Sequence, residues 1–412
     1  MKYKEDINND NRKLFLWILL PIILLAVLVL SGCSKIISWS LLLPITVFIS
    51  KKSPITQKAG LQLLDYSFLI IAASEILALL RSSYMPNSVD SFLSFAAAIV
   101  LWFFMRSYIT EKKQIVYIVH LLLLASVVLT SLTILNYVKH RNHFLSLGFV
   151  DLTAVRQYYH PLGQLSNDWT AMLICLLPAP LVVLFRSNKN VLKVLCAATL
   201  VAINYAVLVS FSRGAYLALF LFYISLLFSI VLFHRKSFIK CACIATISLA
   251  ISFSFTIPDR VSVLTTLSMN KTTVQSRSTE GRLNKWQESL TLFKSKPCTG
   301  YGGGNFQMAS TLYGNKNYDT LSFRSTNSYL QILVEKGAIG GVCYLLAIIA
   351  VMVTAIASAK KSLDTIPFIA ALMALLAHEL FFSSISEKIY LLFVMVILLY
   401  LTYYPLIHHE KE

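Results

Sequence analysis

The sequence predicts an all-α integral membrane protein whose helices cross the bilayer many times. Of its 412 residues, 57% are hydrophobic and only 13% are charged, and the mean hydropathy is +0.69. Soluble domains carry far more charge. Apolar runs long enough to cross a bilayer recur along the chain, and Lys and Arg gather in the short connections between them. The expected architecture is a polytopic helical bundle with a long outer loop that contains short helices.

A window of about twenty apolar residues places about twelve spans on the chain. They are 14–33, 36–50, 63–80, 91–109, 115–137, 167–185, 191–211, 214–233, 238–257, 338–358, 367–385 and 390–407. The second of these is short for a full crossing. Three segments follow: 1–257 with the first nine spans and an outer loop near 138–166, 258–337 as a loop with amphipathic and membrane-surface helices, and 338–412 with the last three spans.

The distribution of positive charge predicts the orientation. A net charge of +17 would suggest nucleic-acid binding in a soluble protein, but here the cations fall in alternate connections between spans. Positive loops stay in the cytoplasm, so these connections and both termini are placed there. The long connections 138–166 and 258–337 then lie outside, where we expect the function, and no nucleic-acid role is predicted.

The N-terminus allows a second interpretation. Leu30-Ser31-Gly32-Cys33 follows an apolar run and matches a lipoprotein cleavage box. The leader before it contains Glu5, Asp6 and Asp10, whereas such leaders are typically basic. We therefore expect the first span to be retained.

The seven cysteines predict no metal site. Most of them lie inside apolar runs, and Cys241-x-Cys243 lacks the usual two-residue ligand spacing and a second pair nearby. Small packing residues account for them, and neither a disulfide framework nor a cofactor is expected.

Few charged residues lie inside the early spans. Glu75 lies deep in the third span, where hydrogen bonding to another helix is expected and a proton relay is the alternative. The first outer loop mixes Arg156 and His160 with tyrosines and apolar residues. Such a loop can bind sugars or phosphates through cationic and aromatic side chains, or it can simply anchor at the membrane surface.

Arg213 is the most informative residue of the chain. It stands in SFSRGAYLALFLF, between two stretches apolar enough to cross a bilayer. A guanidinium keeps its charge and is expensive at membrane depth, so it should face a polar cavity or an anion. With Arg282 and Arg324 in the later loop, a lipid-borne diphosphate is the expected partner.

The later loop predicts two short helices. Arg282 is expected to open an amphipathic helix with Leu283, Trp286 and Leu290 on one face. Pro297 and the glycines that follow should end it, and these glycines lack the Lys-Ser/Thr of a nucleotide-binding loop. The glycines at issue are Gly300, Gly302, Gly303 and Gly304.

A second helix is expected from Thr326 to Lys336, lying at or dipping into the outer leaflet. Ser325 or Thr326 is the predicted N-cap, and Gly337 and Gly340 are expected to break the helix. Free amides at its start, together with Arg324, would form a cradle for a diphosphate. An ordinary helix cap is the alternative.

These blocks resemble the O-antigen ligase and O-antigen polymerase superfamily of bacterial envelope polysaccharide assembly. The resemblance covers about residues 200–385 and also fits the span count. It rests on Arg213-x-x-x-Leu217, on Gly281-Arg282-Leu283-x-x-Trp286 followed by Pro297-x-x-Gly300-x-Gly302-x-x-Asn305-Phe306, and on Asn327-Ser328-Tyr329-Leu330 leading to Glu335-Lys336-Gly337.

The resemblance implies metal-independent, inverting glycosyl transfer at the periplasmic face of the inner membrane. The donor would be an undecaprenyl diphosphate-linked glycan, with Arg213 and Arg282 holding the diphosphate. Arg324, Thr326 and Asn327 would join the substrate site beside Arg156 and His160 of the first loop. The acceptor would be a lipid-linked repeat or lipid A core, and whether a chain-length regulator takes part is left open.

One departure from the family pattern affects the choice of acceptor. Its ligases usually carry His immediately before the Asn, and Thr326 stands there. Threonine cannot accept a proton at neutral pH, which favours a repeat-unit polymerase over a ligase. His378 and Glu379 in the eleventh span are substitute candidates for the base, with helix packing as the alternative. A lipid-linked glycan transporter is favoured less, because ionisable residues are not spread along the spans.

Overall fold

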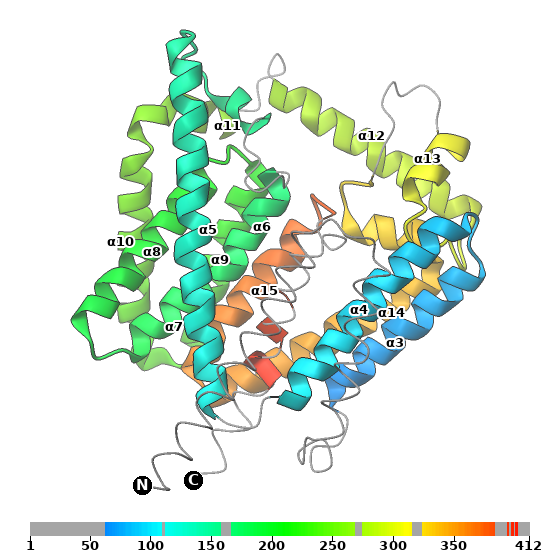
Figure 1. Ribbon diagram of the computed structural model, residues 1–412, viewed down its shortest axis with the longest axis horizontal. Coiled ribbons are helices and arrows are strands. Elements are labelled where there is room, and N and C mark those ends of the chain that lie inside the picture. The colour runs from blue at the N-terminus through cyan, green and yellow to red at the C-terminus, as the bar shows by residue number, and fades with distance from the viewer. Residues whose placement is uncertain are drawn as a thin grey trace, which may run out of the picture. The chain divides into compact units, whose positions relative to one another are not determined.

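The computed structural model describes residues 62–108, 112–157, 166–267, 274–314 and 324–383, together with 394, 397, 398 and 400–402. In these residues the regular structure is entirely helical (Figure 1). All of them belong to the contact unit Pro54–Glu412. The predicted spans 14–33 and 36–50, and most of 390–407, lie outside the described residues.

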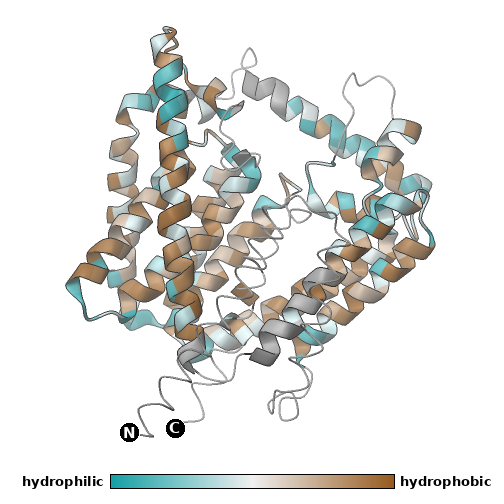
Figure 2. Cartoon of the chain, in the orientation of Figure 1, coloured by the Kyte–Doolittle hydropathy of each residue, from teal (hydrophilic) through white to brown (hydrophobic). Residues whose placement is uncertain are grey.

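Seven described helical segments are long and apolar enough to cross a membrane, and they confirm an integral membrane protein. Most of their residues are hydrophobic (Figure 2), and large apolar side chains such as Phe228 and Ile239 are 62% and 75% exposed. The predicted total of about twelve spans is not confirmed. The segments are α3 (Leu63–Leu80), α5 (Lys112–Ser146), α6 (Ser166–Leu176) with α7 (Pro178–Arg186), α8 (Asn190–Leu208), α9 (Arg213–Phe233), α10 (Phe238–Phe255) preceded by η3 (Arg235–Ser237), and α14 (Ser328–Lys361).

The other elements are helical as well. α4 (Met85–Tyr108) covers residues 91–108 of the predicted span 91–109. α15 (Ile366–His378) has 13 residues and ends before the predicted limit of 385, because the chain turns between His378 and Phe382. The remaining ones are η1 (Thr153–Gln157), η4 (Ile257–Asp259), α11 (Arg260–Leu267), α12 (Val274–Ser295), α13 (Phe306–Tyr313) and η5 (Leu363–Thr365).

The broken segment α6–α7 lies in the core of the described helices. Of the residues in its most apolar 18-residue stretch, 89% are buried. Pro178 begins α7 because proline cannot continue the preceding helix but suits a first helical position. The Trp169 indole is buried and donates to Thr133 Oγ1 on α5 at 2.7 Å. α15 packs chiefly on α9 and also on α6. This packing fixes the first turn of α6, from which two site residues project.

A kink interrupts α14 at Gly337. Gly337 has φ 66° and ψ −168°, a region open only to glycine, and an added Cβ would lie 2.2 Å from the Cys298 carbonyl oxygen. The loop after α12 satisfies the freed carbonyls, with Tyr301 N donating to Val334 O at 3.0 Å and Gly302 N donating to Glu335 O at 2.7 Å. The predicted break at Gly337 is confirmed. The one predicted at Gly340 is wrong, because Gly340 is helical.

α12 differs from its prediction at the N-terminus. It begins at Val274, so Arg282 lies inside the helix and does not open it. Leu283 and Leu290 are 51% and 43% exposed, whereas Ser289 and Leu292 are buried. Leu283 and Leu290 therefore lie on an exposed side of the helix, and other residues make its packing contacts. The end of the helix at Ser295, just before Pro297, is as expected.

Candidate functional site

Arg213 begins α9 at a polar turn between two apolar helices. Ser212 caps the helix, and its Oγ accepts a hydrogen bond from Ala215 N at 3.4 Å. The Arg213 guanidinium Nη2 donates to Thr279 Oγ1 on α12 at 2.6 Å. The next residue is Gly214, whose absent side chain makes room for Phe382, since a Cβ there would lie 2.8 Å from Phe382 Cε2. The start of α9 is thus joined to α12 and to the turn after α15.

Arg156 lies beside this turn. It projects from η1, and its Nη2 donates to Asn167 Oδ1 at 2.8 Å. The same oxygen accepts a hydrogen bond from Ser212 Oγ at 2.8 Å, so Asn167 holds η1 against the start of α9. Burial lowers the pKa of Arg156, and the nearby charge of Arg213 lowers it further.

Arg282 completes a group of three guanidiniums. Its Cζ lies 4.6 Å from the centre of the Phe382 ring, a cation–π contact. Burial lowers the pKa of Arg282 to about 10, with further contributions from Arg156 and Arg213. We call Arg156, Arg213 and Arg282 the arginine cluster, because the charges of the first two both act on the third.

The positive charges of the arginine cluster repel one another, because they are close together and partly removed from water. Lys285, one turn after Arg282 on α12, adds to this positive field. Its pKa is lowered by burial, raised by Glu288, and lowered again by Arg282 and Arg324. An anion placed among these groups would relieve the repulsion and accept several charge-assisted hydrogen bonds. The arrangement therefore suits a phosphate or diphosphate.

Arg324 forms an ion pair with a carboxylate. Its Nη2 lies 2.9 Å from Asp168 Oδ2, and its Nη1 donates to the Ser383 carbonyl at 2.9 Å. Asp168 is 3% exposed, so this ion pair is largely removed from water. Sequence reasoning missed Asp168 and its neighbour Asn167. The available signal was two polar residues directly at the start of an apolar span.

The start of α14 is capped by a different residue than the sequence suggested. Asn327 is the N-cap, and its Oδ1 accepts from Leu330 N at 3.0 Å. Ser328 N donates to the Glu379 carbonyl at 3.0 Å, so two of the first amides already have protein acceptors and the predicted anion cradle is not open there. Thr326 is in the left-handed region with φ 59°, and its buried Oγ1 has no hydrogen-bond partner among the described residues.

His378 and Glu379 lie next to this helix start, at the end of α15. They are 1% and 4% exposed, and Glu379 Oε2 accepts a hydrogen bond from Ser328 Oγ. The His378 ring stacks on Phe382 with centroids 5.0 Å apart, and His378 Nδ1 is 4.0 Å from Glu379 Oε1. Neither ring nitrogen of His378 has a hydrogen-bond partner within the described part of the chain. Phe382 therefore links His378 to Arg282.

A second polar group lies between α3 and α14, and we call it the buried ion-pair cluster. Lys336 Nζ contacts Glu75 Oε1 and is 2.7 Å from Tyr344 OH, which donates to Glu75 Oε1 at 2.9 Å. Glu335 accepts hydrogen bonds from Gly304 N at 3.1 Å and from Gln331 Nε2 at 2.9 Å. The prediction that Glu75 hydrogen-bonds to another helix is confirmed.

The structure thus gathers most of the predicted site residues. The arginine cluster brings together Arg156, Arg213 and Arg282. Around the start of α14 and the end of α15 lie Arg324, Asn327, His378 and Glu379. His160 lies outside the described residues.

Residues 197–345 match the family model described as O-antigen ligase. No curated protein matches the chain. The matched segment contains Arg213, Arg282, Arg324 and Asn327, whereas Arg156 and His378 lie outside it. The match supports the resemblance for residues 197–345, which are similar to the O-antigen ligase family.

Proposed function

We propose that the protein transfers a glycan from a lipid diphosphate to the hydroxyl of an acceptor sugar, with inversion at the anomeric carbon. The active site would face the periplasm, in a bacterial inner membrane with both chain termini in the cytoplasm. The arginine cluster carries this proposal, because three guanidiniums that repel one another form a site for a multiply charged anion.

The reaction needs a stabilised leaving group, and the arginine cluster could stabilise it. The acceptor oxygen attacks the anomeric carbon, the bond from that carbon to the phosphate oxygen breaks, and the electron pair leaves with the lipid diphosphate. Negative charge therefore grows on the leaving group, where fixed guanidiniums stabilise it. A diphosphate leaves without needing a general acid, and the guanidiniums would supply the charge stabilisation that a metal ion could otherwise give. Undecaprenyl diphosphate is the donor carrier that the family implies.

The hydroxyl proton needs an acceptor, and His378 with Glu379 is our candidate. The His378 ring stacks on Phe382, which contacts Arg282, and Glu379 lies beside His378. Neither ring nitrogen of His378 has a hydrogen-bond partner within the described residues, so the unprotonated nitrogen of the neutral ring could accept from a substrate hydroxyl. Arg324 and Asn327 would position the substrate through the helix start that they support.

A polymerase is our preferred assignment, with another lipid-linked repeat unit as acceptor. Thr326 occupies the position of the ligase histidine, and its strained backbone and buried hydroxyl leave it no role as a base. A ligase that loads lipid A core is the second candidate, because the matched family model is described as O-antigen ligase.

Release of the lipid diphosphate tests the proposal. Purified full-length protein in lipid nanodiscs is incubated with a lipid-diphosphate oligosaccharide, alone or together with lipid A core, and products are separated by mass. A polymerase forms multimers and free lipid diphosphate from the donor alone, whereas a ligase releases it only with lipid A core. If no diphosphate is released in either reaction, the protein is not this transferase, and a transporter becomes the better explanation.

A further inference from the structure

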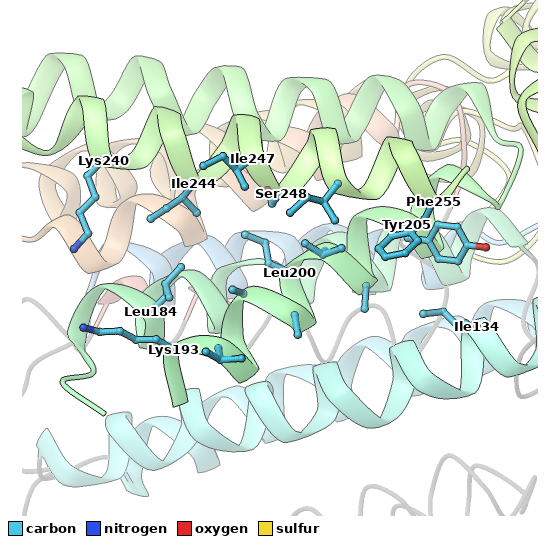
Figure 3. Close-up of a pocket in the computed structure, with 16 residues that line it drawn as sticks. Ile134, Leu184, Lys193, Leu200, Tyr205, Lys240, Ile244, Ile247, Ser248 and Phe255 are labelled. Atoms are coloured by element: carbon cyan, nitrogen blue, oxygen red, sulfur yellow. The ribbon is translucent and has the colours of Figure 1, made fainter. Parts of the chain in front are cut away.

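An apolar groove lies between α5, α8 and α10, away from the residues described above. It encloses about 910 Å³ and is lined by 16 residues, of which the only charged ones are Lys193 and Lys240 (Figure 3). Its floor is α8, where Ala197, Ala198 and Ala202 leave the surface hollow between its two neighbours. Ser248 and Tyr205 are the other polar residues of the lining.

The two ends of the groove differ in chemistry. Lys193 and Lys240, near the starts of α8 and α10, extend their ammonium groups at one end, while Tyr205 and Phe255 lie at the other (Figure 3). The rings of Tyr205 and Phe255 are 6.3 Å apart in an edge contact. From residue 193 to 205, α8 rises roughly 18 Å, close to the thickness of one leaflet's hydrocarbon. The groove thus has the length of an acyl chain and a cationic end.

The lysine end has positive charge without a matching carboxylate. Nearby on α7, Arg186 is neutralised by Asp364 at 2.5 Å. Within the described residues, neither Lys193 nor Lys240 has an acidic partner within ion-pair distance, and Lys240 instead lies 5.8 Å above the Phe185 ring. Basic pockets between membrane helices on the cytoplasmic side suit anionic lipid headgroups. A transmembrane helix filling the same groove would leave these two charges uncompensated.

From this geometry we propose that the groove binds an anionic phospholipid, with an acyl chain along α8 and the phosphate between Lys193 and Lys240. On the predicted topology, this end of the groove faces the cytoplasm. The lipid would therefore come from the inner leaflet, on the opposite side from the arginine cluster. The proposal does not depend on the glycosyl transfer proposed above.

Native mass spectrometry of the delipidated full-length protein tests the assignment, with dioleoyl phosphatidylglycerol and dioleoyl phosphatidylcholine as probes. The wild type should bind phosphatidylglycerol more tightly, and the double variant Lys193→Gln/Lys240→Gln should lose about tenfold of that affinity. Phosphatidylcholine binding should change little in that variant. Lys236→Gln is the matched control, because Lys236 is an exposed lysine of the same region that does not line the groove.

A second variant tests the apolar part of the groove. Ala198→Trp fills the hollow over α8 and should lower the number of bound lipids of both kinds, while the protein elutes unchanged on size exclusion. The proposal is overturned if the double lysine variant keeps the wild-type preference for phosphatidylglycerol. It is equally overturned if Ala198→Trp converts a dimer to a monomer with no loss of bound lipid, because a second copy of the chain then occupies the groove.

Discussion

The arginine cluster and the buried ion-pair cluster are both polar groups in an apolar helical protein. The first gathers like charges, whereas the second pairs opposite charges. In the ion-pair cluster, Lys336 faces Glu75, and Tyr344 bonds to both. In the arginine cluster, the charges of Arg156 and Arg213 both depress the pKa of Arg282. Matched charges need no ligand, whereas gathered like charges favour one. On this basis we propose that the ion-pair cluster supports the structure and that the arginine cluster binds an anion.

The connections of the two clusters support this division. The ion-pair cluster joins α3 to the kink of α14, where the glycine loop also docks. The arginine cluster draws on η1, α9 and α12, and Asn167 of α6 joins two of these. A site assembled from several segments needs rigid neighbours to hold its geometry. The kinked α14 supplies one of them, because its first turn packs on the residues around Phe382.

The largest expected effect comes from breaking the matched pair. Lys336→Met leaves the Glu75 carboxylate buried without its cation, and the loss of stability should be about 3–5 kcal/mol. Thermal unfolding of the detergent-solubilised protein measures it. Adding Glu75→Gln should recover much of the loss, because the uncompensated charge is then gone. Lys360→Met, at an exposed lysine of the same helix, is the control. Equal unfolding temperatures for Lys336→Met and Lys360→Met would contradict the structural role.

The next effect concerns activity and should leave stability largely unchanged. Arg213→Ala or Arg282→Ala removes one donor to the leaving diphosphate, which should slow transfer by about 10²–10³-fold. Arg→Lys should also be poorly tolerated if the contact is bidentate. The rate of lipid diphosphate release measures these losses, and Arg260→Ala on α11 is the matched control at an exposed arginine. Near-normal rates in both alanine variants would assign the cluster to packing.

A smaller effect tests the support that the kink gives to the site. Gly337→Ala forces a Cβ into a glycine-only conformation and against the Cys298 carbonyl, so it should cost about 1–3 kcal/mol. Gly281→Ala is the contrast, because it lies in α12 with no atom within 4 Å of its Cβ position. That change should stabilise the helix by about 0.5–1 kcal/mol. Thermal unfolding of both variants checks the opposite signs, and a shared sign would argue against the kink.

Much of the fold was predictable because hydrophobic length is a strong signal in membrane proteins. The predicted limits 63–80 coincide with α3, and 214–233 differs from α9 by one residue. Helix boundaries inside the later loop were less predictable. Arg282 was expected to open its helix, yet α12 begins at Val274, because the polar residues before Arg282 give no apolar period to read.

The site was predictable where single charges stood in apolar surroundings and unpredictable where partners came from distant segments. Arg213 was identifiable because a guanidinium among leucines needs an explanation. Its proximity to Arg156 depends on Asn167, and the neutralisation of Arg324 depends on Asp168. No local pattern encodes these contacts. Asn327 was identifiable as part of a motif, but its capping role depends on the backbone turn at Thr326.

Diphosphate binding would show directly whether the arginine cluster is an anion site. Farnesyl diphosphate is titrated into purified protein at fixed ionic strength, with farnesol as the uncharged ligand of the same chain. If the arginine cluster binds the diphosphate, wild type and Arg260→Ala should bind farnesyl diphosphate equally, and Arg282→Ala should bind it at least tenfold more weakly. Farnesol binding should be the same in all three proteins. Equal affinity of Arg282→Ala and wild type for farnesyl diphosphate would show that the arginine cluster does not bind the diphosphate.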